Sequence, residues 1–225
     1  MKWFAGTCSL MAVLVAVVCP ADGGRADKAA ESVRLSQPEL DKGLPVMKAL
    51  KNRRSDRSFS EKKLSHAQMS ELVWAANGVN REDGKRTAPA AINIQAVDIY
   101  VVTAEGVYLY DAGKHELNRV IAGDHRKFAG SQGFVREAPV NLVYVADMAR
   151  FGQSAAKASD EQKMAWVAIE TGCQAQNAAL YCASEGLGSI VRTSIDAGAF
   201  GGLVGLRPEQ VVILSQTVGH PKTGD

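Results

Sequence analysis

The sequence lacks the residue patterns on which most protein-borne chemistry depends. It has no G-x-S-x-G nucleophile elbow, no nucleophile and base pair, and no His, Cys or Asp cluster at metal-ligand spacing. The glycine-rich segment 198–205 does not follow a strand in the G-x-G-x-x-G manner, so a Rossmann dinucleotide motif is unsupported and a short, tightly packed helix is expected there. An enzyme without such groups is best explained by a bound cofactor that carries the reaction.

Cysteine is also scarce, and its placement argues against an internal disulfide. Cys173 and Cys182 lie nine residues apart on one predicted helix, about 13 Å at ~1.5 Å per residue. A disulfide needs Cα atoms within about 7 Å, so these two cannot pair within one chain. Each is interpreted as a small buried residue. The alternative is a disulfide between two chains across a two-fold axis.

No hydrophobic run is long enough to span a membrane. The longest, Leu10–Val18, has nine residues where a bilayer needs roughly 20. With the basic start and the small-x-small pattern at Gly24 to Ala26, it predicts a cleaved secretory signal over 1–26 and a soluble periplasmic or extracellular protein. Cys19 raises the alternative of a lipoprotein, but the preceding valines are bulkier than such a site normally takes, so no stable membrane anchor is expected.

The remaining chain also lacks a charge excess. Removing Lys2, Arg25 and Asp22 with the leader leaves 24 basic and 23 acidic residues, which predicts no nucleic-acid partner. About 199 residues then remain, within the range of one domain. We expect an extended arm over 27–43 and a single domain over 44–225.

Hydrophobic patterns predict the elements of that domain. Ser65 is a candidate N-cap for a helix whose apolar residues recur at three and four. The alternating segments after Gln95 and Gly106 predict an antiparallel hairpin, and the apolar run after Ala138 predicts a strand buried on both faces. The expected helices are 44–50, 64–76 and 160–186, and the expected strands are 97–102, 106–111, 138–146 and 210–219.

Two polar segments are candidates for ligand binding. Arginines and serines crowd the segment 51–59, and guanidinium forks that converge from one turn suit a phosphate monoester, although a solvated basic face is the alternative. The segment 86–95 carries carboxamides at Asn93 and Gln95, which can offer donors and acceptors to a planar heterocycle, although an ordinary loop has the same composition.

Both segments resemble motifs of the nitroreductase superfamily of FMN-dependent, dimeric oxidoreductases. The pattern Arg-Arg-Ser-x-Arg-x-Phe is similar to the family's opening motif, which implies that the FMN phosphate is held by Arg53, Arg54, Ser55 and Arg57. The family's Pro-Ser-x-x-Asn-x-Gln, which meets the flavin ring, is matched by Pro89, Asn93 and Gln95, with Ala90 in place of the serine. Ala96-Val97 replaces the frequent Pro-Trp, which alters the substrate-side wall.

Three further segments extend the resemblance over residues 45–222. A stripe of small residues along 160–186, with Gln176 and Asn177, resembles the family's central helix, which implies a homodimer contact; a plain core helix is the alternative. By the same resemblance Leu187 and Gly188 approach the flavin, and Lys222, after Gly-His-Pro, reaches its phosphate. The pattern Gly-Val-Tyr-x-Tyr-Asp at 106–111 is similar to the SagB-like azoline dehydrogenase branch.

The resemblance implies an α+β fold with a mostly antiparallel central sheet, flanking helices and a long helix at the dimer interface. The implied function is an FMN-dependent oxidoreductase that passes hydride through flavin N5 from NAD(P)H to a small oxidised acceptor such as a nitroaromatic or a quinone. One alternative is a flavin-dependent dehydrogenase that oxidises an azoline-like substrate, which export favours because NAD(P)H is scarce outside the cytoplasm. Another is a flavin-binding protein without turnover. No metal is expected.

Overall fold

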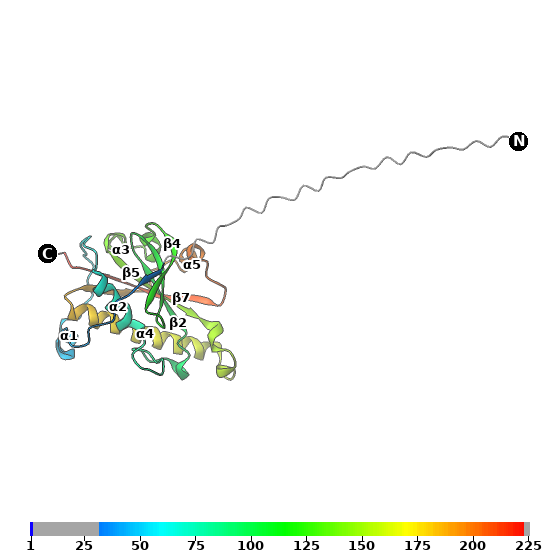
Figure 1. The fold of residues 1–225 in the computed structure, drawn as a ribbon, viewed down its shortest axis with the longest axis horizontal. Helices are drawn as coiled ribbons and strands as arrows, with labels where there is room; N and C mark the ends of the chain where they lie inside the picture. Colours follow the sequence, from blue (N-terminus) through cyan, green and yellow to red (C-terminus); the bar gives the residue numbers. More distant parts are fainter. Residues whose placement is uncertain (2–31, 223–225) are drawn as a thin grey trace.

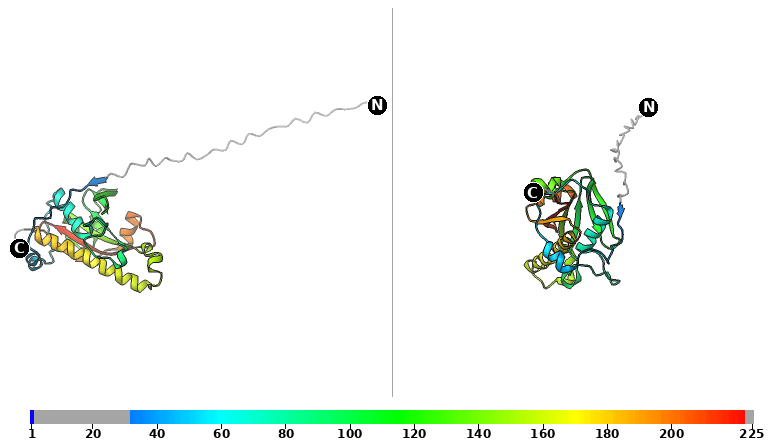
Figure 2. Two further views of the ribbon diagram at one scale, coloured as in Figure 1. Left: turned by 60° about the horizontal axis from the view of Figure 1, so that its bottom comes forward. Right: turned by 90° about the vertical axis from the view of Figure 1, so that its left-hand side faces the viewer.

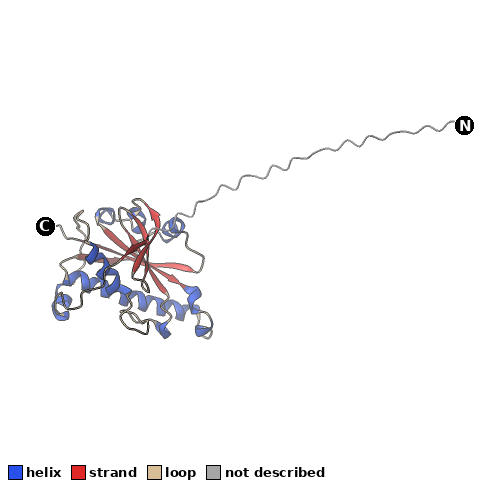
Figure 3. Ribbon diagram, viewed as in Figure 1, coloured by secondary structure: helices blue, strands red, loops and turns tan. Residues whose placement is uncertain are grey.

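A seven-stranded antiparallel sheet forms the centre of the protein (Figure 3). The structure is a computed structural model that describes Met1 and residues 32–222, so the predicted leader and the first part of the arm lie outside the described residues. The strand order is β1-β4-β3-β2-β5-β7-β6, and every neighbouring pair is antiparallel. The strands are β1 Ser32–Arg34, β2 Val97–Val102, β3 Gly106–Asp111, β4 Glu116–Ala122, β5 Val140–Asp147, β6 Gly188–Arg192 and β7 Gln210–Gly219.

Helices cover both faces of the sheet (Figure 1). One large core lies between the sheet and α2 and α4, and a second lies between the opposite face and α3 and α5. The predicted α+β class, with its antiparallel sheet and flanking helices, is therefore confirmed. The helices are α1 Val46–Asn52, α2 His66–Asn77, α3 Gly133–Glu137, α4 Asp160–Ser184 and α5 Ala197–Val204, and short 3-10 turns are η1 Ala91–Asn93, η2 Arg126–Ala129, η3 Met148–Phe151 and η4 Gln153–Ala155.

Local sequence explains where the two main helices begin. The Ser65 side chain accepts a hydrogen bond from the Gln68 backbone at 3.1 Å, and the Gln68 side chain accepts one from the Ser65 backbone at 3.0 Å. This reciprocal capping satisfies two amide groups that a helix start leaves without partners. Ser159 caps α4 in the same sense through the Gln162 backbone at 3.2 Å.

Strand β5 lies inside the sheet between β2 and β7, and all eight of its residues are buried. Polar groups inside the core are paired across elements. Tyr144 of β5 donates to Gln216 of β7 at 2.7 Å, and the Gln216 amide donates to the Ala175 carbonyl of α4 at 3.1 Å. Because unpaired buried polar groups are costly, these bonds fix how α4 lies on the sheet.

The structure adds three strands that the sequence patterns did not predict. β1 lies inside the predicted arm and pairs with β4, and β4 itself extends the hairpin to a three-stranded meander. β6 starts at Gly188, where only a helix-closing turn was expected. These additions matter for the site, because β6 is the strand on which the arginine-rich segment docks.

Candidate functional site

The arginine-rich segment 53–59, here called the basic loop, leaves α1 and attaches to β6. Ser55 forms an isolated parallel bridge with Ser189, and the Asp56 backbone donates to the Ser189 carbonyl at 3.1 Å. At its far end Phe59 is fully buried, and its ring centroid lies 6.0 Å from that of Phe134. The loop is therefore anchored at both ends while its cationic side chains stay exposed.

The C-terminal turn meets the basic loop and completes a cationic hollow. Phe59 pairs with Pro221, and the Lys222 backbone donates to the Ser58 carbonyl at 3.2 Å. A hollow of about 280 Å³ results, and its lining includes Arg54, Ser55, Arg57 and Lys222. The structure thus brings together residues that are about 165 positions apart in the sequence.

Acidic neighbours neutralise part of this charge. Arg54 pairs with Asp56 at 2.9 Å and Lys222 pairs with Glu137 at 3.1 Å. Arg57 is exposed, and no carboxylate in the described part of the chain pairs with it. Arg53 caps the end of α1 and is also exposed. Of the two arginines that line the hollow, Arg57 is therefore the one whose guanidinium is more available to an external anion.

Gly188 has a steric role in this arrangement. It pairs with Gly219 at the start of β6, and a Cβ atom placed on it would lie 2.9 Å from the Asp56 Cβ atom. The preceding Leu187 is buried. A glycine at 188 therefore lets the basic loop approach the strand closely.

The carboxamide segment around η1, here called the carboxamide loop (residues 89–95), has a strained backbone. Ile92, Asn93 and Gln95 have φ values of 45°, 57° and 53°, in the left-handed region that few residues other than glycine adopt. The Gln95 amide donates to the Asn93 side chain at 3.1 Å, and Arg150 donates to the Gln95 carbonyl at 2.9 Å. Strain held by surrounding bonds is typical of functional loops, so the segment is a candidate ligand contact.

The remaining predicted members of this loop are Pro89, which is exposed, and Ala90, which is half-buried and precedes η1. Ala90 has no hydroxyl, so the serine contact of the resembling motif is absent from this chain. The exposed carboxamide of Asn93 and the half-buried one of Gln95 remain as the polar groups of the loop.

Within one chain the basic loop and the carboxamide loop lie apart along α4. The start of β2, just after the carboxamide loop, is bound by Glu170 in the middle of α4, through the Ala96 and Val97 amides at 3.3 Å. The basic loop lies beyond the C-terminal end of α4, which α1 also contacts (Figure 2). Twelve residues from Glu170 to Cys182 correspond to about 18 Å of helix. The two loops line different hollows in a single chain.

One face of α4 has no cover within the described residues. Ala165, Ala168, Ile169, Gly172 and Gln176 are exposed, and Ile169 retains 64% of its accessible surface. This is much of the small-residue stripe noted in the sequence, whereas its Ala179 is buried. An apolar helix face of small residues is suited to close packing against another helix.

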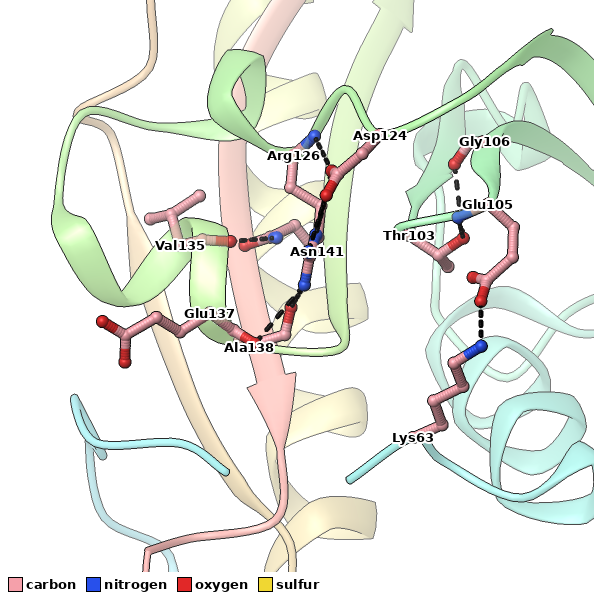
Figure 4. A network of polar contacts seen from close by, with 10 residues as sticks. All are labelled: Lys63, Thr103, Glu105, Gly106, Asp124, Arg126, Val135, Glu137, Ala138 and Asn141. Carbon is pink, nitrogen blue, oxygen red and sulfur yellow. Dashed lines mark hydrogen bonds and ion pairs between the residues drawn. The ribbon is translucent and has the colours of Figure 1, made fainter. Parts of the chain in front are cut away.

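A polar network holds the strand ends next to the basic loop (Figure 4). Arg126 binds Asp124 and donates to the Glu137 and Ala138 carbonyls at 3.4 and 3.1 Å. On the other side Lys63, just after the basic loop, pairs with Glu105 in the hairpin turn. These bonds position the residues around α3, including Glu137, which reaches Lys222.

Arg192 is a buried cation that sequence reasoning missed. It is 6% exposed and donates to the Ala129 carbonyl at 3.0 Å and to Thr217 at 2.7 Å, while its Nε atom has no partner. Burial lowers the pKa of Arg192 to about 10. The burial of Arg192 can be predicted from the sequence only if β6 is predicted, because the alternation of side chains along that strand then places Arg192 on an inward face.

Glu170 is the corresponding buried acid, and it was also missed. It is 4% exposed, and burial raises the pKa of its carboxyl group above the ordinary value, although the two backbone amides that it accepts from act against this shift. An acidic residue on the buried face of a predicted helix is the signal that could have found it.

Two features do not occur in the described part of the chain. Over residues 32–222, no helix combines the length and apolar character needed to cross a bilayer. Within the same residues, no three His, Cys, Asp or Glu side chains gather in a way that could hold a metal ion.

The seven-stranded antiparallel sheet, the long α4 and the cationic hollow beside β6 describe an α+β protein with a cluster of basic side chains at one edge of its sheet. The chain belongs to the nitroreductase family, whose model matches residues 50–220. Membership of this family supports an oxidoreductase function.

Individual relatives agree with this assignment. A nitroreductase-like protein of Methanocaldococcus jannaschii is 28% identical over 170 residues, 71% of this chain and 83% of that protein. The crystal structure of a nitroreductase-like protein of Ralstonia eutropha JMP134 is 37% identical, with a TM-score of 0.80 over 87% of this chain and 92% of that one. The NADPH:FMN oxidoreductase of Vibrio harveyi in complex with NAD+ shares the fold at 24% identity and a TM-score of 0.59, over 79% of this chain and 69% of that one.

Proposed function

We propose that the protein is an FMN-dependent oxidoreductase and that the cationic hollow beside β6 holds the FMN phosphate. The observation that carries this proposal is the convergence of Arg54, Ser55, Arg57 and Lys222 on one hollow. Guanidinium and ammonium donors with a hydroxyl match a phosphate monoester in charge and in hydrogen bonding. Arg53, at the end of α1, adds positive charge at the rim.

The carboxamides of Asn93 and Gln95 are proposed to orient the flavin ring, next to Pro89 and Ala90. Because the basic loop and the carboxamide loop of one chain lie at different places along α4, a complete site needs the basic loop of one copy and the carboxamide loop of another. The exposed face of α4 supports a homodimer in which two copies pack there about a two-fold axis, so that each pair builds two equal sites.

In such a site the chain's own residues bind and orient while the cofactor carries the electrons. When bound, FMN would supply two-electron redox chemistry between a reduced nicotinamide and an oxidised acceptor, such as a nitroaromatic or a quinone. Arg57 and Lys222 hold the phosphate end. The Asn93 and Gln95 side chains would donate hydrogen bonds to the ring, and such donors favour negative charge there. Gly188, buried at the start of β6, lets the basic loop pack closely on the strand, and the preceding Leu187 is buried in the main core.

Two finer assignments remain part of this proposal. The Gly-Val-Tyr-x-Tyr-Asp pattern at β3, followed by His115, favours placement near the SagB-like branch. The pattern of residues 1–26 supports export to a periplasmic or extracellular space, as the sequence predicts.

An anaerobic absorbance titration tests the proposal. The purified protein should show an oxidised flavin spectrum that bleaches when NADH or NADPH is added. A flavin spectrum that neither nicotinamide changes would instead favour a substrate dehydrogenase or a flavin-binding protein. A colourless protein that cannot be reconstituted with FMN would refute the proposal.

The residue assignment is tested by Arg57→Ala, with Arg34→Ala as the matched control. Arg34 is exposed on β1, at the opposite edge of the sheet from β6. Loss of a charge-assisted phosphate contact of about 1.5–3 kcal/mol should weaken FMN binding by roughly 10- to 150-fold in Arg57→Ala only. Unchanged affinity in Arg57→Ala would remove Arg57 from the site.

A further inference from the structure

A second hollow, here called the Trp166 hollow, opens beside the carboxamide loop. It measures about 450 Å³ and lies between η1, η4 and the first turns of α4. Its volume falls in the range of small-molecule sites, about 300–1,000 Å³. None of the residues assigned to the FMN phosphate lines the Trp166 hollow.

The walls of the Trp166 hollow are mostly apolar. The apolar lining residues are Ile92, Ala155, Ala156, Ala158 and Trp166. Trp166 is half-buried, with its ring 6.0 Å from that of Phe151 and inclined at 38°, so packing fixes its orientation. Ile92 remains 60% exposed on a left-handed backbone, which holds an apolar side chain at the mouth and outside the core. Such walls suit a flat, apolar molecule.

The charge on these walls has one sign. Lys157 is the one cation in the lining, and the lining contains no acid. Within residues 32–222, no carboxylate pairs with Lys157, which is exposed. The nearby Lys163, in contrast, pairs with Asp160 at 3.3 Å. Gln153 and Gln162 add neutral carboxamides to the rim. An anionic group on the ligand would therefore meet one cation and no carboxylate among the lining residues.

We propose that the Trp166 hollow receives the planar apolar part of the electron acceptor and that Lys157 favours acceptors with an anionic substituent. This rests on the proposed function, because the carboxamide loop that borders the hollow is there assigned to the flavin ring. The proposed substrates are therefore planar electron acceptors that carry an anionic group, such as carboxylated nitroaromatics or quinones. Lys157 is a specificity-determining residue that takes no part in electron transfer.

Calorimetric titration with two non-reducible probes tests this inference on the whole protein at low salt, with and without added FMN. The probes are naphthalene-2-carboxylate and naphthalen-2-ylmethanol, which differ mainly in charge. An exposed ion pair predicts that the wild type binds the carboxylate about two- to fivefold more tightly. Lys157→Gln should abolish the preference, and the control Lys163→Gln should retain it. Trp166→Ala should weaken both probes alike.

Equal affinity for the two probes in the wild type, or a preference that survives in Lys157→Gln, would overturn the inference, as would failure to bind either probe under both conditions. The flavin spectrum of the same samples reports separately on the proposed function. A protein that holds no FMN refutes that function. A protein that holds FMN and shows no charge preference refutes only the inference about Lys157.

Discussion

Gly188→Ala perturbs the contact on which the cationic hollow depends. The new Cβ atom would lie 2.9 Å from the Asp56 Cβ, 3.1 Å from its Oδ2 and 3.2 Å from its Cγ. An ordinary contact is about 3.5–4.0 Å, so Asp56 must move by roughly half an ångström or more. The Asp56 backbone also donates to the Ser189 carbonyl, so its movement displaces Ser55 and Arg57 with it.

The cost of that movement falls on stability, on FMN binding, or on both. If the basic loop keeps its position, overpacking against the new methyl group costs about 1–3 kcal/mol, which lowers Tm by roughly 2–12 °C in a domain of this size. If the loop yields, the loss of one charge-assisted phosphate contact, about 1.5–3 kcal/mol, weakens FMN binding by roughly 10- to 150-fold. We expect the larger part on binding, because the loop is exposed while β6 is fixed by β7.

Thermal unfolding followed by circular dichroism and FMN titration followed by flavin fluorescence measure the two costs on the same samples. Gly202→Ala is the control, because nothing lies within 4 Å of a Cβ there and the change lies within α5. It should leave FMN affinity unchanged and keep or raise stability by up to about 1 kcal/mol. A Gly188→Ala protein that melts and binds FMN like the wild type would refute the steric argument.

Two further predictions concern stability. Ser65→Ala removes the α2 cap and should lower the free energy of unfolding by about 1 kcal/mol in urea titrations; an unchanged midpoint would show that the cap is not needed. Because burial raises the pKa of Glu170, the folded state holds the proton of this carboxyl group more tightly than the unfolded state does. The stability that this proton contributes is therefore lost as the pH rises from about 4.5 through the raised pKa. Glu170→Gln should flatten that decline, and a stability difference from wild type that does not vary between pH 4 and 8 would contradict it.

The elements that the sequence predicts are those whose pattern is local. The capping box of α2 lies within four residues, and the hairpin of β2 and β3 closes through one short turn, so neighbouring residues specify both. β5 is recognisable because its eight consecutive buried residues are largely apolar, with Asn141 and the final Asp147 as the exceptions. The length of α4 follows from its own helical period.

The elements that were missed depend on distant partners. β6 has five residues after the glycine turn that ends α4, and its pairing comes from β7, more than twenty positions later. β4 mixes buried Leu117 with exposed Val120, so its alternation is weak, and it is held by β3 and β1. A strand whose pattern is weak becomes visible only when its neighbours are known.

The site shows the same division. The motif residues of the basic loop could be read from the sequence, and the structure gathers three of the four with Lys222. Their contact with Gly188, and the distance between the basic and carboxamide loops along α4, arise from tertiary packing and could not be predicted. The buried charge of Arg192 belongs to the same group, because it depends on β6.

The margins of the sheet bear on how copies of the chain can associate. A sheet edge presents unpaired amides and carbonyls that recruit strands from other molecules. Here one edge strand is β1, which has only three residues, and the other is β6, which is partly covered where Ser55 bridges to Ser189. Both β1 and Ser55 belong to the first quarter of the chain. Growth of the sheet from chain to chain is thereby discouraged, and self-association is directed to surfaces that pack side chains.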